Sequence, residues 1–362
     1  MDHVALLEKL MCAFGPSGYE SEVAYLFKAE LEKTADSVTV DRMGNVIAKY
    51  DGTDPNAPVV MAFAHLDQLG FIVRRIEDDG FIQVDRMGGI PEIVLPGLNV
   101  KIRTKDGRLI SGVIGSKSHH AAAPEDKYKV HPVTEQFIDI GASSSEQVRA
   151  LGIEIGCPVT YQPYFQTLQN NMVSGTAIDN RGGLTVLAVA GEYLKANKPK
   201  ATVYLVGTVW EEFNLRGAML AARTVKPDIT ISIDVALTGD TRDLARRYET
   251  RCGNGPALVM YSFHGRGTLN GTLPHAGMAA LVEKTAAEEN IPLQHFAGLG
   301  ILTDNAYVQL EGMGTAAIEL AFPARYTHTP VETANTNDIQ QLGKLLAEVV
   351  KRIDSSFDLN RY

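Results

Sequence analysis

Val59-Val60-Met61-Ala62-Phe63-Ala64 is an uninterrupted apolar run that leads directly into His65-Leu66-Asp67. Apolar runs of this length are typical of strands that are buried on both faces of an open α/β sheet. Such sheets place their functional residues at the carboxyl ends of the strands. The sequence therefore predicts that His65 and Asp67 lie at the edge of a sheet where a site is built.

Two later segments repeat this arrangement. The run 202–210 is followed by Glu211 and Glu212, and the run 229–233 leads into Asp234. Helical patterns at 182–196 and 217–223 alternate with these runs, and 315–322 is predicted to be a further strand before His328. This alternation predicts an α/β fold, with an open sheet flanked by helices and with acids and a histidine gathered at one edge.

The middle of the chain has a different texture. From about Gln68 to Gln166, short alternating runs are separated by Gly, Pro and Asp-Gly, as in 100–104 and 109–114 across Asp106-Gly107. Such spacing is typical of a small β-barrel or sandwich. We therefore predict an α/β domain formed by residues 1–67 and 169–362, interrupted by a β-rich insert at 68–168.

Patterns near the two ends support this division. Residues 38–50 alternate apolar and polar residues around Met43-Gly44-Asn45, which predicts a hairpin. The last helix is expected to begin at Asn335 or Thr336 as its cap. Its apolar face is formed by Ile339, Leu342, Leu345, Leu346, Val349, Val350 and Ile353.

Composition limits the classes of partner. The chain has 362 residues, 45% of them hydrophobic, and a formal charge of −9 without a long Lys/Arg cluster, which argues against nucleic acid. No apolar run approaches the roughly 20 residues that span a bilayer. Cys12, Cys157 and Cys252 are widely spaced, are interpreted as small buried hydrophobes and fit a reduced compartment. We expect a cytoplasmic protein with neither a nucleic-acid nor a membrane partner.

The residues at the strand ends have the chemistry of metal ligands. Carboxylates combined with neutral imidazoles suit zinc, cobalt or manganese. Two cations about 3.5–4 Å apart need an anion between them, because they otherwise repel each other. Asp179, just before a predicted helix, is well placed to be that bridge. In the pair Glu211-Glu212, one carboxylate can bind a metal while its neighbour accepts a proton from water.

Each of these residues also has an ordinary structural explanation. Glu288-Glu289 shows that a Glu pair can simply be a solvated helix face. Glu211 can be an exposed strand end, Asp234 the cap of a turn, and His328 a loop histidine before Pro330. The other histidines lack a strand-end acidic context and are interpreted mostly as surface or supporting residues, with the pair His119-His120 left open as facing the site from the insert.

Several motifs nevertheless follow one another in a specific order. They are Gly15-Pro16-Ser17-Gly18-Tyr19-Glu20, Met43-Gly44-Asn45-Val46, Ala64-His65-Leu66-Asp67, Gly112-Val113-Ile114-Gly115, Asp139-Ile140-Gly141-Ala142, Ala177-Ile178-Asp179-Asn180-Arg181, Glu211-Glu212, Arg216-Gly217-Ala218 and Tyr326-Thr327-His328-Thr329-Pro330-Val331-Glu332. In this order the chain resembles the dinuclear metallo-aminopeptidases that include glutamyl aminopeptidase and the self-compartmentalising tetrahedral (TET) particles. The resemblance covers essentially the whole chain.

The resemblance implies a role for each candidate residue. His65, Asp179 and Asp234 would bind the first of two divalent ions, which the resemblance implies are zinc. Asp179, Glu212 and His328 would bind the second. Glu211 would be the general base, and Asp67 would hold the ring of His65. A cis Asp179–Asn180 peptide bond is also implied.

The position of the insert and two departures refine the resemblance. An insert between His65 and Asp179 is the TET arrangement, where it serves dimerisation, and it implies a homo-oligomer of twelve subunits that hydrolyses short peptides. Phe213-Asn214 and 303–307 depart from the usual family pattern near the expected substrate pocket, so the preferred N-terminal residue stays open. Some members carry an endoglucanase label, so a metal-independent glycoside hydrolase is an alternative, as is an assembly protein without catalysis.

Overall fold

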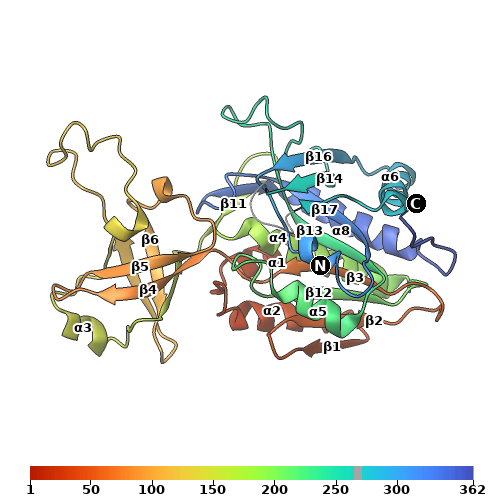
Figure 1. Ribbon diagram of the computed structural model, residues 1–362, viewed down its shortest axis with the longest axis horizontal. Helices are drawn as coiled ribbons and strands as arrows, with labels where there is room; N and C mark the ends of the chain where they lie inside the picture. Colours follow the sequence, from red (N-terminus) through yellow and green to blue (C-terminus); the bar gives the residue numbers. More distant parts are fainter. Residues whose placement is uncertain (265–270, 362) are drawn as a thin grey trace.

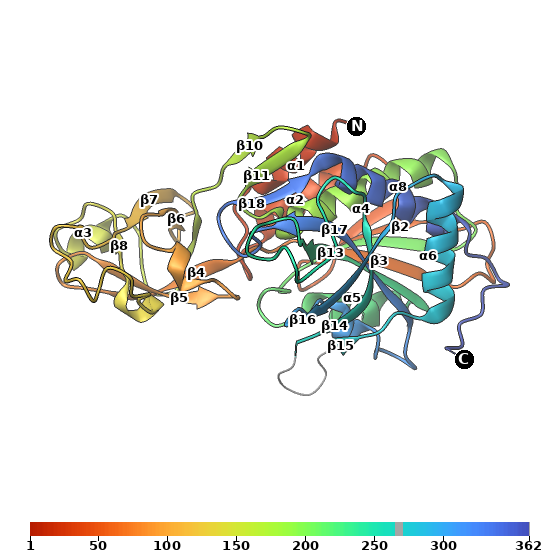
Figure 2. The same cartoon turned by 90° about the horizontal axis from the view of Figure 1, so that it is seen from above.

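Two β-structures organise the chain in the computed structural model, which describes residues 1–264 and 271–361. One is a 12-stranded sheet and the other is a closed barrel. The barrel, in orange and yellow, lies at one end of an elongated molecule, and the sheet with its helices forms the other end (Figures 1 and 2). The predicted combination of an open α/β sheet with a small β-barrel is confirmed.

Four parallel strands form the centre of the large sheet, in the order β12 (Val203–Thr208), β3 (Val60–His65), β13 (Ile229–Leu237) and β17 (Ala316–Arg325). Nearly all of their side chains are buried, as continuous apolar runs predict. Because the strands are parallel, their carboxyl ends meet at one edge. His65 pairs with Thr208 at that edge.

Antiparallel strands extend the sheet on both sides. β1 and β2 form the predicted hairpin beside β12. β18 and β11 continue from β17, and β14 to β16 form a branch on β17. The bounds of these strands are β1 Ser37–Val40, β2 Val46–Tyr50, β10 Phe165–Thr167, β11 Met172–Gly175, β14 Ala257–Phe263, β15 Gly271–Thr272, β16 Gln294–Leu299 and β18 Glu332–Asn335.

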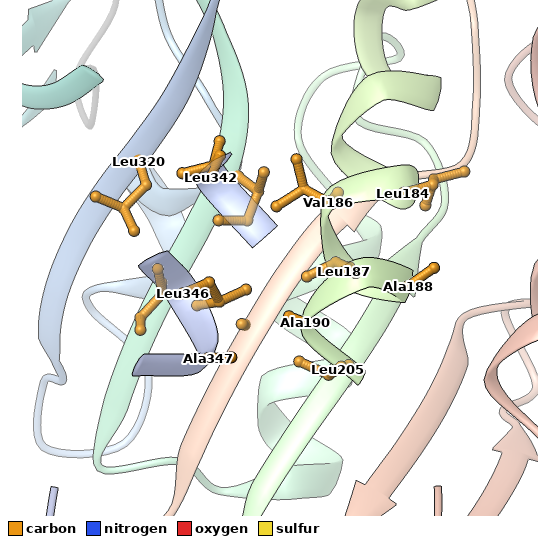
Figure 3. Close-up of a cluster of buried hydrophobic side chains, with 14 of the residues drawn as sticks. Leu184, Val186, Leu187, Ala188, Ala190, Leu205, Leu320, Leu342, Leu346 and Ala347 are labelled. Atoms are coloured by element: carbon orange, nitrogen blue, oxygen red, sulfur yellow. The ribbon is translucent and has the colours of Figure 1, made fainter. Parts of the chain in front are cut away.

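The main core lies where α4 and α8 pack on the parallel strands. Leu187 and Ala190 of α4 point toward Leu342 and Leu346 of α8, with strand residues such as Leu320 beside them (Figure 3). α5 packs beside β12 and β3 in a smaller, separate cluster. The helices are α1 His3–Met11, α2 Ser21–Leu31, α4 Ile178–Ala196, α5 Gly217–Val225, α6 Ala276–Glu288, α7 Asn305–Val308 and α8 Thr336–Lys351.

Two helix starts position the site. Asn335 caps α8 as predicted, with its side chain accepting a hydrogen bond from the amide of Asn337. α4 begins earlier than its sequence pattern predicts, at Ile178, and Asp179 and Asn180 have non-helical backbone angles inside it. The Asp179–Asn180 peptide bond is cis, as the resemblance implied.

The barrel is closed in the strand order β4-β5-β8-β7-β6-β9 around its own apolar core. Its elements are β4 Gly70–Ile76, β5 Ile82–Met87, η1 Glu92–Val94, β6 Asn99–Arg103, β7 Leu109–Ile114, η2 Val133–Glu135, β8 Ile138–Asp139, α3 Ser145–Ala150 and β9 Pro158–Tyr161. The domain limits at residues 68 and 168 stay a prediction.

The structure also bears on the predicted burial of the cysteines and on membrane-spanning segments. Cys157 is buried, but Cys12 is exposed, so its interpretation as a buried hydrophobe is wrong. The end of α1 leaves this residue facing outward, while Leu10 and Met11 enter the core. Among the described helices, none is both long and apolar enough to cross a membrane.

Candidate metal centre

The predicted ligands meet where the parallel strands end. His65 is the last residue of β3, Asp234 lies in the last half of β13, and Glu211 and Glu212 follow β12. Asp179 enters from the first turn of α4. His328 comes from the loop between β17 and β18. Residues far apart in sequence are therefore brought to one edge by the order of the strands.

His65 has a defined ring orientation. Its Nδ1 lies 3.0 Å from the main-chain oxygen of Asp67, and because a carbonyl only accepts, Nδ1–H is the donor. Its Nε2 faces inward, 3.1 Å from Oδ1 of Asp179 and 3.9 Å from Oε2 of Glu211. A histidine that is fixed through Nδ1 and turns Nε2 toward carboxylates has the arrangement of a metal ligand.

His328 has the same arrangement. Its Nδ1 lies 2.9 Å from the main-chain oxygen of Gly89, in the segment between β5 and η1. Its Nε2 is 3.8 Å from Oδ2 of Asp179 and 3.8 Å from Oε1 of Glu212. The two histidines thus point their Nε2 atoms at different oxygens of one carboxylate, that of Asp179.

Asp67 has more partners than the resemblance implied. Its carboxylate accepts hydrogen bonds from the hydroxyl of Ser17 at 2.6 Å and from the amides of Glu211 at 3.0 Å and Glu212 at 3.1 Å. Nδ1 of His65 lies 3.5 Å from Oδ1 of Asp67 but only 3.0 Å from the main-chain oxygen of Asp67. The Asp67 side chain therefore fixes mainly the backbone of the Glu pair.

Glu332 is a site residue that sequence reasoning left without a role. Its Oε2 accepts from the amide of Asp179 at 2.9 Å, and its Oε1 accepts from the amide of His328 at 2.7 Å. Burial, and then repulsion from Asp179, raises the pKa of Glu332 to about 8. Its position at the end of the matched His328 motif was the available signal.

The carboxylates of the site outnumber its histidines, so the site carries an excess of negative charge when the carboxylates are ionised. Burial raises the pKa of Glu211 and of Asp234 well above the usual range, and neighbouring carboxylates raise both further. Burial also raises the pKa of Glu212 to about 7. For His65, burial acts to lower the pKa, but Glu211, Asp179 and Asp67 together raise it well above its usual value. Cations placed between these groups would relieve the repulsion.

The donor atoms form compact groups that fit metal ions. One group is His65, Asp179 and Asp234, and a second is Asp179, Glu212 and His328. In each group the ligand atoms lie within 4.8 Å of one another. Oε1 of Glu212 is buried without a hydrogen-bond partner in the described part of the chain. This donor set fits two divalent ions that share Asp179, although His65, Glu211 and Glu212 form a third group.

A cavity of about 670 Å³ opens over these residues. Its wall includes Phe213, Asn214, Thr303 and Tyr307, so both departures from the family pattern lie at the cavity as expected. Val235, Leu237, Ile301 and Leu302 contribute apolar surface. The cavity is large enough to receive the end of a peptide beside the ligand groups.

Among the remaining histidines, His264 and His275 differ from the expectation. His264 lines the cavity, which its sequence context did not predict. His119 and His120 are exposed and are not part of the described cavity wall. His275 is buried, caps α6 and contacts the main-chain oxygen of Asn360, so it is an exception to the prediction that most of these histidines are surface or supporting residues.

Comparison with known proteins agrees with this geometry. Residues 44–345 match the M42 glutamyl aminopeptidase family. The chain belongs to that family. SgcX of Escherichia coli strain K12, provisionally named an aminopeptidase, is 38% identical over 91% of this chain and 88% of its own length.

Solved structures show the same relationship. An aminopeptidase from the archaeon Desulfurococcus kamchatkensis superposes with a TM-score of 0.92 at 33% identity, covering 98% of this chain and 96% of that one. The TET1 peptidase of Pyrococcus horikoshii has a TM-score of 0.85 at 27% identity, covering 97% of this chain and 100% of that one. Its structure is described as able to assemble into a tetrahedron or a large octahedral shell. This M42 chain therefore has the fold of the TET aminopeptidases.

Proposed function

We propose that this M42 protein is a metal-dependent aminopeptidase that removes the N-terminal residue from short peptides. The observation that carries the proposal is the shared carboxylate of Asp179, toward which His65 and His328 point their Nε2 atoms. The first ion would be held by His65, Asp179 and Asp234, and the second by Asp179, Glu212 and His328. Zinc is the ion we expect, with cobalt or manganese as substitutes.

Bound at these two groups, divalent ions would polarise the scissile carbonyl and make a water molecule acidic near neutral pH. The chain itself would position the substrate, because the residues that line the cavity include both the proposed ligands and apolar side chains. Asp67 fixes the turn that carries Glu211 and Glu212 through two amide hydrogen bonds. The Glu pair therefore keeps a defined orientation relative to His65.

Glu211 is proposed as the general base. Its side chain is about one-tenth exposed and has Oε2 3.9 Å from Nε2 of His65. Glu212 instead has Oε1 3.8 Å from Nε2 of His328, within the second ligand group. A free carboxylate beside the attacking water can take its proton and later pass that proton to the leaving amine.

Self-association is proposed for the barrel. Leu109, Val113, Val130 and Phe137 of this region are each between 43% and 49% exposed, so the insert carries apolar surface that a second subunit could cover. We propose dimers joined through the insert that build a particle of twelve subunits. A monomer in light scattering across a wide range of concentration would contradict this assembly but not the catalytic proposal.

The test of the activity is a panel of aminoacyl nitroanilides with acidic, basic and apolar residues. Hydrolysis that EDTA abolishes and zinc or cobalt restores supports the aminopeptidase. Cleavage of a β-glucan that is insensitive to EDTA would instead support a glycoside hydrolase, which uses two carboxylates and no catalytic metal. Protein that contains no metal and hydrolyses no substrate of the panel would indicate an assembly protein.

A further inference from the structure

Glu332 is connected to both halves of the candidate centre. Its two carboxylate oxygens accept from two different amides, Oε2 from Asp179 at 2.9 Å and Oε1 from His328 at 2.7 Å. The residue is 3% exposed, so water does not compete for these oxygens. Asp67 accepts in the same way from the amides of Glu211 and Glu212, but these two residues are neighbours in sequence, whereas Asp179 and His328 come from separate segments of the chain.

We propose that Glu332 is a positioning residue that sets the distance between Asp179 and His328 and thereby the affinity of the second metal site. This inference rests on the proposed function, because it takes Asp179 and His328 to be ligands. Glu332 itself faces the backbone of these residues and belongs to none of the three ligand groups. It therefore acts on the ions through the two ligands.

The backbone around His328 explains why such a support is needed. His328 has φ 66° and Tyr326 has φ 58°, in the left-handed region that residues with a side chain seldom adopt. A loop in this conformation holds its shape only where neighbouring contacts determine it. The hydrogen bond from the His328 amide to Glu332 provides one contact, and the ring contact with Gly89 provides another.

Asp179 is held by the other oxygen of the same carboxylate. Ala177, directly before α4, also has a left-handed backbone, with φ 61°. The main chain of Glu332 is fixed independently, because β18 pairs with β11 and Gly175 lies opposite Glu332. The side chain of Glu332 thus links a stable strand to two irregular segments that each carry a ligand.

The chain offers a matched control in Asp338. This carboxylate is 1% exposed and likewise accepts from two backbone amides, those of Gly253 at 2.6 Å and Gly255 at 2.9 Å. Neither glycine is a candidate ligand. Burial raises the pKa of Asp338 as it does that of Glu332. Asp338→Asn therefore reproduces the loss of a buried, doubly bonded carboxylate without touching the centre.

The experiment compares zinc binding to the metal-free wild type, Glu332→Gln and Asp338→Asn by competition with a chromophoric chelator. In Glu332→Gln, the amide nitrogen would face one of the two backbone N–H groups, so one ligand must move. Because changes to groups that orient ligands typically cost 10- to 100-fold in metal affinity, we expect a loss of that size at the second site. The first site should lose less, and raising the zinc concentration should restore turnover.

Glu332→Asp provides a second variant if Glu332→Gln does not fold, since it keeps the carboxyl group but is one methylene too short to reach both amides. It should also weaken the second site. Wild-type affinity at both sites in either variant, or an equal loss in Asp338→Asn, would overturn the role of Glu332. A wild type that binds no pair of ions would instead overturn the proposed function, so the two failures are distinguishable.

Discussion

Nδ1 of His328 donates a hydrogen bond to the main-chain oxygen of Gly89 across 2.9 Å. Gly89 lies between β5 and η1, in the segment that joins strands of the barrel, whereas His328 lies in the loop between two strands of the large sheet, β17 and β18. The barrel region thus orients a ring that we propose binds the second ion. A shift of the segment around Gly89 would therefore also shift the ring of His328.

Gly89→Ala should weaken the second ion. A Cβ at Gly89 would lie 3.0 Å from Nδ1 and 3.2 Å from Cε1 of His328, so either the ring or the segment must shift. We expect about a 10-fold loss of zinc affinity at one site, in line with other groups that orient ligands. Gly115→Ala is the control, because the nearest atom to its Cβ is a ring carbon of Phe137 at 3.9 Å. Equal affinities in the two variants would speak against the contact.

Asp179→Ala should remove both ions. The two cations would lose their shared anion and face each other's charge with less screening. Metal analysis of the dialysed variant should find far less than one ion per chain. A content near two per chain would refute the bridging assignment.

His65→Ala and His328→Ala should each affect mainly one ion. In the two groups that share Asp179, each ring belongs to a different group. Titration with cobalt, followed by its visible absorption, should show one tight site retained in each variant. Loss of both sites in each variant would mean that the two groups do not bind separately.

The metal-free protein should lose stability as the pH rises from about 5 to 8. Burial raises the pKa of Glu212 to about 7 and that of Glu332 to about 8, so the unfolded chain releases these protons at lower pH than the folded chain. The raised pKa of His328, about 9, acts in the same direction, because its stabilising charge is lost as the pH rises toward that value.

Thermal unfolding in EDTA at several pH values measures this trend. Zinc should raise the unfolding temperature more at pH 8 than at pH 5, because its ligands bind in their deprotonated forms. A metal-free protein that becomes steadily more stable between pH 5 and pH 8 would contradict the charge balance described for the centre.

The sequence was sufficient to predict the parallel strands and their polar ends. The apolar run before His65 is buried throughout β3, and the runs before Glu211 and within 229–233 form its neighbours β12 and β13. This succeeded because burial on both faces demands continuous apolar residues. The start of α4 was predicted too late, because the irregular turn at Asp179 carries no helical periodicity.

Other parts of the site leave little trace in sequence. Gly89 contributes only a main-chain oxygen, which any residue possesses, so its contact with His328 depends on how the barrel is placed. Glu332 is the first residue of a strand whose four residues are all buried. The presence of a glutamate in the sequence does not reveal which backbone amides donate hydrogen bonds to it. His264 reaches the cavity from the end of a strand without an acidic neighbour. These relationships are set by tertiary structure.

The most specific part of the proposed mechanism is that Glu211 acts as the general base, whereas Glu212 binds the second ion. Glu212→Gln should lower occupancy of the second ion, since an amide is a poorer ligand than a carboxylate. Glu211→Gln should keep both ions, because that residue lies near His65 but outside the two groups that share Asp179. Glu212→Gln is therefore expected to lose activity because it loses metal, and Glu211→Gln to lose activity while it keeps both ions.

The most direct measurement is metal content and turnover of Glu211→Gln, together with its affinity for an aminophosphonate inhibitor. The amide keeps the size of the side chain but does not accept the proton of the attacking water. We predict near two ions per chain, inhibitor binding close to that of the wild type, and a turnover roughly 10²- to 10⁴-fold lower, the usual worth of a general base. Loss of metal from Glu211→Gln while Glu212→Gln keeps it, or wild-type turnover in both, would contradict the account.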